Sequence, residues 1–571
     1  MMAEVRMATH CLAQYSMVSP FLSDFKIMKY ISKKIVVMMV AIVILTQSGC
    51  KKGWLDVNYN PLQLTDQSAT PDLVLPALLE SCIATDSKTK FIQQWMGYWS
   101  YYQMNPGLNQ VTYLRIQANE NTFNLQPRPE IFYLEKKAKG SGQQFYEGIA
   151  KVIRALQWHR AVDVINNMPY SEAYKTDIRQ PKYDDARLIY EDLMVQLDLA
   201  SGLIKNADIN KNIKLALSDI MFHGDKTLWL KFINTLKLRL LVHQANRPDR
   251  AAYITEQIQK IEAEGSGFLE SGQDAAVNPG YVLGKNLSRY FGLFSSHNIY
   301  GGGEFSAETQ LATDYYAHAN LYSMELLKAN EDPRLGYIYS TIDDEVPQGA
   351  PEPFTQSSPL NFRANKFGLY IDNLEYPYQN NTYVSAVGGS RNIEVVHPSA
   401  SGIIKGHNMS DWVMTSVESY FLQAEAVQRG WLPGDAESVY KEAVRESFRW
   451  LNVGENKGDP GLSDAIFEDW YSRQVAAGNS NVSWAAAPDK YKLIMIQKYH
   501  AFNGIEPMET WVDYRRNGRF PNVPASLSPQ RVGNTVPFRL LYDQLEYELN
   551  QEHVTAQGQI DVFTSKIWWM P

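Results

Sequence analysis

Aromatic residues are most concentrated in the segment FIQQWMGYWSYYQMN, at residues 91–105 of the sequence. Rings of Trp and Tyr pair an apolar face with a polar edge, so they can stack on a sugar or a peptide. On a helix, four of them would form one continuous stripe, at i, i+3, i+4 and i+7. The alternative is that the stripe belongs to the core. The candidate ligand-binding residues are these four and two more from a later Gly-rich segment: Trp95, Tyr98, Trp99, Tyr102, Tyr290 and Tyr300.

Patterns for catalysis or metal binding are missing from the sequence. The ten His residues include no pair three to five positions apart and no HExxH, which argues against a zinc enzyme. There is also no GxSxG, Walker loop or GxGxxG. Carboxylates are abundant, but any two could be imagined as a glycosidase pair, so their number is not evidence. We therefore expect no catalytic residue, no metal and no cofactor, and we expect Glu418 and Glu425 to have packing or capping roles.

The N-terminal segment has the pattern of an export signal. Residues 35–46 form a 12-residue apolar run with four lysines before it and small residues after it. That run is shorter than the ~20 residues a spanning helix needs, which favours a signal peptide over residues 1–49, with Met28 as an alternative start. The segment Gln47-Ser48-Gly49-Cys50 resembles a bacterial lipobox, although Gln47 departs from the usual aliphatic residue. We therefore predict lipidation at Cys50 and a polar tether over residues 50–66.

Charge and cysteine content limit the possible partners. The formal net charge is -8, and because residues 1–49 carry about +3, the remaining body carries about -11. Such a surface repels phosphate backbones, so we expect no nucleic-acid partner. The three cysteines are Cys11, Cys50 and Cys82, and two of them precede the body, so no disulfide framework is available. Cys82 is expected to be an ordinary buried thiol.

Apolar periodicity predicts a mainly α fold. Helical stripes cover residues 144–165 and 228–242, and a third begins at residue 417, breaks at Gly430 and Pro433, and restarts after Asp435 as the N-cap. Paired short amphipathic helices are typical of tetratricopeptide-like units, here degenerate ones. Residues of about 265–410 are instead rich in Gly, Asn, Ser, Pro and aromatics, which predicts a functional loop-rich region.

Six segments in order resemble the SusD/RagB family of outer-membrane nutrient-binding lipoproteins, in its large second subgroup. They are WLDVNYNP, VDVINNMPYSEAY with PKYDDARLIYEDL, GDKTLWLKFINTLKLRLL, MTSVESYFLQAEAVQRGW, IMIQKYHAFNGIEPMETWVDYRRNGRFP and SKIWWMP. The resemblance implies a SusD-like binding domain over residues 67–571. Its scaffold would be four degenerate tetratricopeptide-like helix pairs, with a large loop-rich ligand-binding region. It also implies a SusC-type TonB-dependent outer membrane transporter as partner, over which the lipoprotein sits like a hinged lid.

These features together favour a binding protein over an enzyme. We expect a cell-surface lipoprotein, anchored to the outer membrane, that binds a nutrient oligosaccharide and delivers it to the transporter. The alternatives are a peptide ligand or a surface glycosidase. Residues 51–53 lack the acidic residues common after the cysteine of surface-exported lipoproteins, so a periplasm-facing location stays open.

Within the motifs, Met168 to Ser171 is expected to end one helix and cap the next. We assign Arg239, Arg515 and Arg516 to tying helix ends.

Overall fold

The computed structural model describes most of the chain after residue 68. The chain divides into two compact units, residues 1–69 and 70–571. Cys50, Tyr102 and Tyr300 lie outside the described residues. Those residues are 69–83, 87–101, 109–114, 127–282, 285–294, 317–342, 359–370, 375–376, 383–389, 401–406, 408–454 and 461–571.

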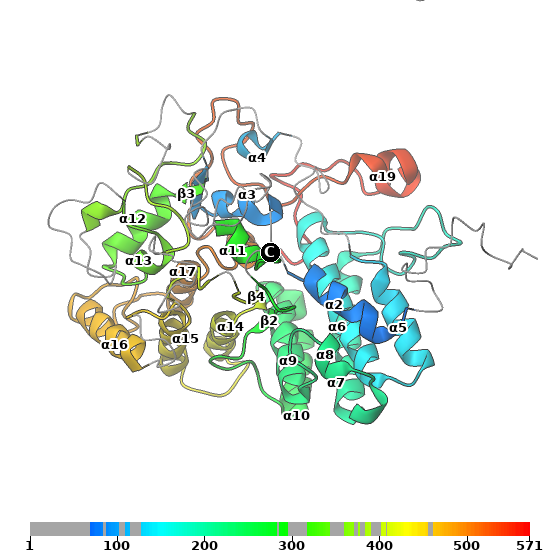
Figure 1. The fold of residues 1–571 in the computed structure, drawn as a ribbon. Helices are drawn as coiled ribbons and strands as arrows, with labels where there is room; N and C mark the ends of the chain where they lie inside the picture. The colour runs from blue at the N-terminus through cyan, green and yellow to red at the C-terminus, as the bar shows by residue number, and fades with distance from the viewer. Residues whose placement is uncertain are drawn as a thin grey trace, which may run out of the picture. The chain divides into compact units, whose positions relative to one another are not determined.

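Helices dominate the described part of the second unit (Figure 1). In its first half they are α2 (Pro71–Ser81), α3 (Ser87–Trp95), α4 (Asn109–Thr112), α5 (Glu130–Gly140), α6 (Gln144–Ile165), α7 (Ala186–Asn206), the 3-10 turn η1 (Ile209–Lys211), α8 (Leu215–Ser218), α9 (Lys226–His243), η2 (Pro248–Arg250) and α10 (Ala251–Glu264). In its second half they are α11 (Arg289–Phe294), α12 (Leu321–Ala329), α13 (Leu335–Ile338), η6 (Pro359–Asn361), α14 (Ser416–Gln428), α15 (Ala436–Trp450), α16 (Gly461–Ala476), α17 (Lys490–Ala501), α18 (Pro507–Arg516), α19 (Gln544–Leu549) and α20 (Gln551–Thr555).

Aspartate N-caps fix where several long helices begin. Asp185 accepts hydrogen bonds from the backbone N–H groups of the first turn of α7, and Asp225 does the same for α9. Asp435 caps α15 as predicted, by accepting from the Ser438 N–H. Each cap satisfies N–H groups that have no partner inside their helix. The predicted helix over residues 144–165 coincides with α6.

The long helices pack both on helices next to them in the sequence and on distant ones. Helix α6 lies against α5 and α7, α7 lies against α9, and α14 packs on α15, α17 and α9 (Figure 1). Their apolar faces belong to one large buried cluster. The predicted mainly helical class is confirmed. Among the residues that the structure describes, no helix is both long enough and apolar enough to cross a bilayer.

Two short antiparallel ladders join the loop-rich region to the helices. Strand β1 (Trp99–Tyr101) pairs with β3 (Ala317–Ala319), with Trp99 opposite Ala319. Strand β2 (Ala275–Val277) pairs with β4 (Asp411–Met414) through an irregular register. Because β2 stands near the start of the loop-rich region and β4 just after its end, the region leaves the helices and returns to them at one place.

Two local predictions were wrong. The aromatic stripe does not continue on one helix, because α3 ends at Trp95 and Gly97 adopts a left-handed φ of 68° before β1 begins. Glycine adopts that conformation without the steric cost of a Cβ. The segment from Met168 to Ser171 does not cap the next helix either. Ser171 instead bonds to Asp184, and α7 begins later, capped by Asp185.

Candidate functional site

The first three aromatic candidates lie in the core. Trp95, Tyr98 and Trp99 are buried. The Trp95 indole N–H donates to the Gln110 carbonyl at 2.8 Å, and the Tyr98 hydroxyl donates to the Tyr499 carbonyl at 2.7 Å. The Tyr98 ring lies 4.6 Å from the Tyr499 ring between centroids. All three rings are buried, and Trp95 and Tyr98 also bond to backbone carbonyls, so their predicted stacking on a ligand stays a prediction for binding measurements.

Tyr290 is also buried, at the start of α11. Its ring stacks on Trp412 with centroids 3.6 Å apart and planes 4° from parallel, and its hydroxyl donates to the Trp412 carbonyl at 3.1 Å. The adjacent Asp411 carboxylate accepts from the Tyr281 and Ser288 hydroxyls and from the N–H groups of Arg289 and Tyr290. Tyr290 thus fixes α11 on β4. The remaining two candidates, Tyr102 and Tyr300, lie outside the described residues.

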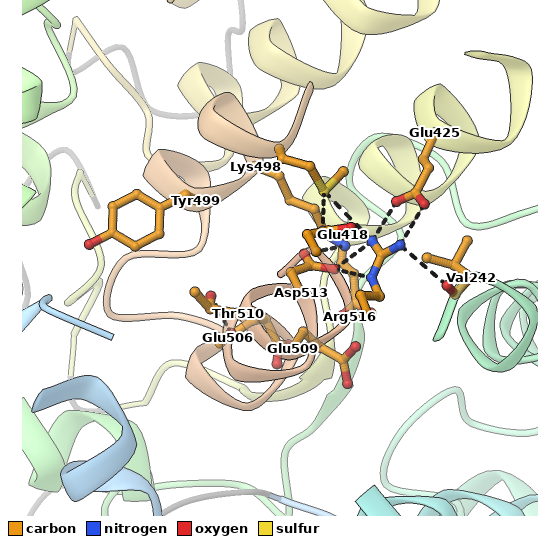
Figure 2. Close-up of polar contacts among 12 residues, drawn as sticks. Val242, Glu418, Glu425, Lys498, Tyr499, Glu506, Glu509, Thr510, Asp513 and Arg516 are labelled. Atoms are coloured by element: carbon orange, nitrogen blue, oxygen red, sulfur yellow. Dashed lines mark hydrogen bonds and ion pairs between the residues drawn. The ribbon is translucent and has the colours of Figure 1, made fainter. Parts of the chain in front are cut away.

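A buried ion-pair network joins helices α14 and α18 (Figure 2). The Arg516 guanidinium makes a two-pronged contact with Glu425, at 2.7 and 2.6 Å, and also bonds to Asp513. Lys498 on α17 adds a second cation at 2.9 Å from Asp513. Burial alone would raise the pKa of Glu425, but the charge and hydrogen bonds of Arg516 hold it below its usual range.

The same network extends to α9 and α6. Arg239 binds Glu418 through two hydrogen bonds, at 2.6 and 2.5 Å. His243 lies between Glu509, with its Nε2 at 2.8 Å, and Asp163, with its Nδ1 at 3.3 Å. Burial would lower the pKa of His243, but these two carboxylates overcome that effect and raise it to about 9.

This ion-pair network has a structural role. Its charged groups are buried and paired with each other across helices that are far apart in the sequence. The structural roles predicted for Glu418, Glu425, Arg239 and Arg516 agree with these contacts. Arg515 differs in detail, because it donates to the backbone carbonyls of Asp163 and Phe538. In the described part of the chain, no group of three or more His, Cys, Asp or Glu residues could hold a metal ion.

Cys82 is a buried thiol, as expected. It is free, and its Sγ donates to the Leu78 carbonyl at 3.3 Å. Burial raises the pKa of the thiol to about 11. A thiol of that pKa is a poor nucleophile at neutral pH, so it offers no covalent chemistry.

An open pocket of about 440 Å³ lies beside the start of α12. Its walls come from three segments that are far apart in the sequence: the first turns of α12, residues 366–367 and residues 524–527. Most of the lining is apolar, with one exposed acid and one exposed base. The lining residues are Asn320, Leu321, Tyr322, Glu325, Leu326, Lys366, Phe367, Pro524, Ala525 and Leu527. That size and character are typical of sites for small ligands.

The predicted aromatic segment contacts the residues that line this pocket. The Trp99 carbonyl accepts from the side chain of Asn320, which caps α12, and the Tyr98 carbonyl accepts from the Asn320 N–H. Tyr322 reaches the pocket and its ring meets the Tyr499 ring edge-on, at 6.2 Å between centroids. The aromatic cluster therefore supports the wall, while Tyr322 supplies an aromatic ring at the pocket itself.

Comparison with known proteins agrees with this architecture. The family model described as "SusD-like, starch-binding associating with outer membrane" matches residues 63–543. The chain belongs to this SusD-like family. Proteins of the family bind nutrients at the outer membrane and catalyse no reaction, so the protein is a nutrient-binding protein of that membrane. The alternative of a surface glycosidase is thereby excluded.

Solved structures share the SusD-like fold. A SusD homolog from Bacteroides fragilis is 18% identical with a TM-score of 0.67, and the match covers 88% of this chain and 100% of that one. A chitin-binding SusD homolog from Flavobacterium johnsoniae is 19% identical with a TM-score of 0.63, covering 87% and 98%. A SusD/RagB family protein from Bacteroides thetaiotaomicron is 19% identical with a TM-score of 0.64, covering 88% and 99%. A comparison with curated protein sequences found no match.

The pocket residues were missed by sequence reasoning. Tyr322 stands alone in the segment HANLYSMELL, with no aromatic stripe around it to draw attention. Its position depends on the pairing of β1 with β3, which brings together segments far apart in the sequence. Only a three-dimensional arrangement reveals that this tyrosine faces the pocket.

Proposed function

We propose that this SusD-like protein is a cell-surface lipoprotein that binds a nutrient oligosaccharide and delivers it to a SusC-type TonB-dependent transporter. The observation that carries the proposal is the family match over residues 63–543, whose description names starch binding. The Flavobacterium johnsoniae relative, which binds chitin, supports a glycan as the ligand class. The acidic, mainly helical body is compatible with such a role and with no nucleic-acid partner.

The lipid anchor is tested at Cys50. Its support is the apolar run, the lysines before it and the small residues after it, followed by the tether at residues 50–66. A palmitate analogue fed to cells should label the protein, and Cys50→Ala should abolish the label. The control Cys82→Ala should keep it, because Cys82 is buried in the folded body. Labelling that persists in Cys50→Ala would remove the anchor from the proposal.

The pocket beside α12 is our proposed ligand site. Tyr322 is its best-placed stacking group, and stacking on an aromatic face adds about 0.5–1.5 kcal/mol beyond area burial. Calorimetry with maltohexaose and chitohexaose should detect binding to the unaltered protein, several-fold weaker in Tyr322→Ala. The matched control Tyr547→Ala removes another partly exposed tyrosine, on α19, and should bind as the unaltered protein does. Equal affinity in both variants would move the site elsewhere.

A peptide ligand is the second candidate, and the lining of the pocket favours it. Seven of the ten lining residues are Leu, Tyr, Phe, Pro or Ala, whereas Glu325 and Lys366 supply the charges. An apolar side chain would be buried there, and the two charges could pair with a peptide's termini. Calorimetry with short peptides that carry Leu or Phe tests this directly. Tight peptide binding without oligosaccharide binding would replace the glycan proposal.

The proposed lid arrangement requires a barrel partner. We interpret pairs such as α6 with α7 and α14 with α15 as members of the four tetratricopeptide-like units of the scaffold. A tether at the membrane raises the effective concentration of the body near any partner there. Affinity purification from detergent-solubilised outer membranes should recover a TonB-dependent barrel at about equal stoichiometry. Recovery of a monomer in several mild detergents would contradict the lid.

A further inference from the structure

A second cavity, of about 320 Å³, lies between the start of α17 and the turn that follows α18. Asp489, Tyr491 and Lys492 line it from the start of α17, and Gly518 and Phe520 line it from the turn. We call it the α17–α18 pocket. Its volume is near the lower end of the range for small-ligand sites, and it shares no lining residue with the pocket beside α12.

Several polar groups of the α17–α18 pocket are already held in place by the ion-pair network. Arg516 lines the pocket, and its guanidinium is held by Glu425 (Figure 2). Its Nη1 also donates to the Tyr491 hydroxyl at 2.9 Å. The Asn517 side-chain oxygen lies 3.0 Å from that hydroxyl and accepts from the Asn246 amide at 2.9 Å. Because these side chains are fixed before a ligand arrives, binding orders few new groups.

Other groups at the pocket keep hydrogen-bonding capacity for a ligand. The Lys492 ammonium is 63% exposed and lies 4.0 Å from Asp489 Oδ2, which is beyond hydrogen-bond distance. The Asp489 Oδ1 atom caps α17 by accepting from the Lys492 N–H at 3.0 Å. Asn517 Nδ2 donates to the Met495 sulfur at 3.3 Å, a weak acceptor, and an amide nitrogen carries two N–H groups. The pocket therefore offers an ammonium donor, a carboxylate acceptor and an amide donor.

The charges at the pocket favour a neutral ligand. Lys492 and Asp489 have opposite signs, so an anionic ligand would meet the carboxylate and a cationic ligand would meet the ammonium. The charge of Arg516 is already paired with Glu425. The partly exposed Phe520 ring adds an apolar face, with its centre 5.9 Å from the Lys492 ammonium. A sugar suits this combination, because its hydroxyls donate and accept while its C–H face packs on an aromatic ring.

We propose that the α17–α18 pocket is an accessory site that binds one neutral sugar unit. The proposal is carried by four groups at one cavity: the Lys492 ammonium, the Asp489 carboxylate, the Asn517 amide and the Phe520 ring. It does not depend on the ligand of the pocket beside α12. Phe520 and Pro524, which line the two pockets, are four residues apart, so their Cα atoms lie within about 14 Å of each other. A test must therefore measure the two pockets separately.

Ligand-observed NMR with single sugars tests the proposal. The parent is the purified protein with Tyr322→Ala, so that stacking at the pocket beside α12 is removed. The neutral probes are glucose, galactose, mannose, xylose and N-acetylglucosamine, and the charged probes are glucuronate and glucosamine. At least one neutral sugar should bind saturably, and more tightly than either charged probe.

Filling the pocket should give the largest loss of binding. Gly518 has a left-handed φ of 66°, and a Cβ on it would meet no atom within 4 Å. Asparagine tolerates this backbone conformation, so Gly518→Asn adds a side chain to the lining and should weaken sugar binding roughly tenfold or more. Gly478→Asn is the matched control. Gly478 has the same φ and the same open space in the turn after α16, and its variant should bind as the parent does.

Removing the ammonium should have a smaller effect. Lys492→Met should weaken sugar binding several-fold, because a charged donor is lost. The control Lys260→Met removes another exposed lysine that pairs within its own helix, α10, and should change nothing. Thermal melts verify that all variants are folded.

Three outcomes would overturn the accessory site. They are the absence of saturable binding by every neutral sugar, equal binding by Gly518→Asn and Gly478→Asn, and a preference for glucuronate or glucosamine. Calorimetry with oligosaccharides reports separately on the pocket beside α12. Oligosaccharide binding without any single-sugar binding would therefore refute this inference and leave the proposed function standing.

Discussion

The helices α9, α14 and α18 and the pocket beside α12 both contain charged and aromatic side chains, but in opposite environments. In the helices, Arg239 and Arg516 are buried against Glu418 and Glu425, and each pair is completed inside the protein. In the pocket, Glu325 and Lys366 are exposed on the wall. Charges that are fully paired in the interior determine stability, whereas charges on an open wall are available to a ligand. The side chains with the most charge and hydrogen-bonding capacity therefore lie in the interior, whereas the proposed ligand site is mostly apolar.

Breaking the central ion pair should give the largest effect. Arg516→Met removes the two-pronged partner of buried Glu425 and leaves only Arg429 beside Glu425 and Lys498 beside Asp513, and breaking a buried pair in this way costs up to about 3–5 kcal/mol. Urea unfolding measures this cost. The control Arg473→Met removes a surface arginine that pairs with Glu331 and Asp469, which should cost less than about 1 kcal/mol. Similar costs for both variants would erase the contrast between interior and surface charges.

Trp99→Ala should act on stability before it acts on binding. Removing a buried tryptophan creates a cavity and costs about 3–5 kcal/mol, whereas Tyr322→Ala at the pocket should cost much less. Thermal melts combined with calorimetry separate the two effects. A Trp99→Ala protein that keeps its stability and loses only ligand affinity would restore the prediction that this ring stacks on a ligand.

The pH dependence of stability should report on His243. Its pKa in the folded protein is about 9, above the ordinary value of 6.5, so the charged form stabilises the fold. This stabilisation is fully present below about pH 6.5 and is lost as the pH rises through about 9, with a total on the order of 3 kcal/mol. The free energy of unfolding at pH 6 and pH 9.5 should differ more in the unaltered protein than in His243→Gln. Equal differences would mean that His243 is not charged in the folded state.

Gly97→Ala should disturb the pocket wall, because Gly97 lies close to the Tyr322 ring. A Cβ on Gly97 would come within 2.9 Å of the Tyr322 ring and 3.0 Å of Val523, at a left-handed φ of 68°. Non-glycine residues in that conformation cost about 1–3 kcal/mol. Gly478→Ala is the matched control, because Gly478 has a φ of 66° with open space around it. Any extra loss of stability or affinity in Gly97→Ala measures crowding at the pocket wall.

Local signals made the helices predictable. The limits of α6 and the break between α14 and α15 follow from apolar periodicity, glycine, proline and the Asp435 cap, all of which act within a few residues. The prediction that the aromatic stripe lies on one helix failed because it also relied on local spacing alone. Its spacing matched a helix, but Gly97 turned the chain in the middle of it.

Long-range partners could not be predicted in the same way. Tyr290 is buried because Trp412 stacks on it from β4, and Tyr322 faces a pocket because β3 pairs with β1. Neither partner is near in sequence, and neither pairing produces a local pattern that can be recognised in a single amino-acid sequence. Burial is decided by what packs across from a residue, so residue type alone identified the aromatic cluster without assigning the roles of its members.

The β2–β4 ladder has a consequence for how such proteins diversify. Ala275 pairs with Met414 and Val277 with Asp411, so the ladder clasps together the entrance and the exit of the loop-rich region. The region is also held by β3, which pairs with β1, so only the segments between these anchors can change in length without shifting the helices. Natural selection, or an engineer, could therefore vary those connecting segments while the two ladders keep the rest of the region on the scaffold.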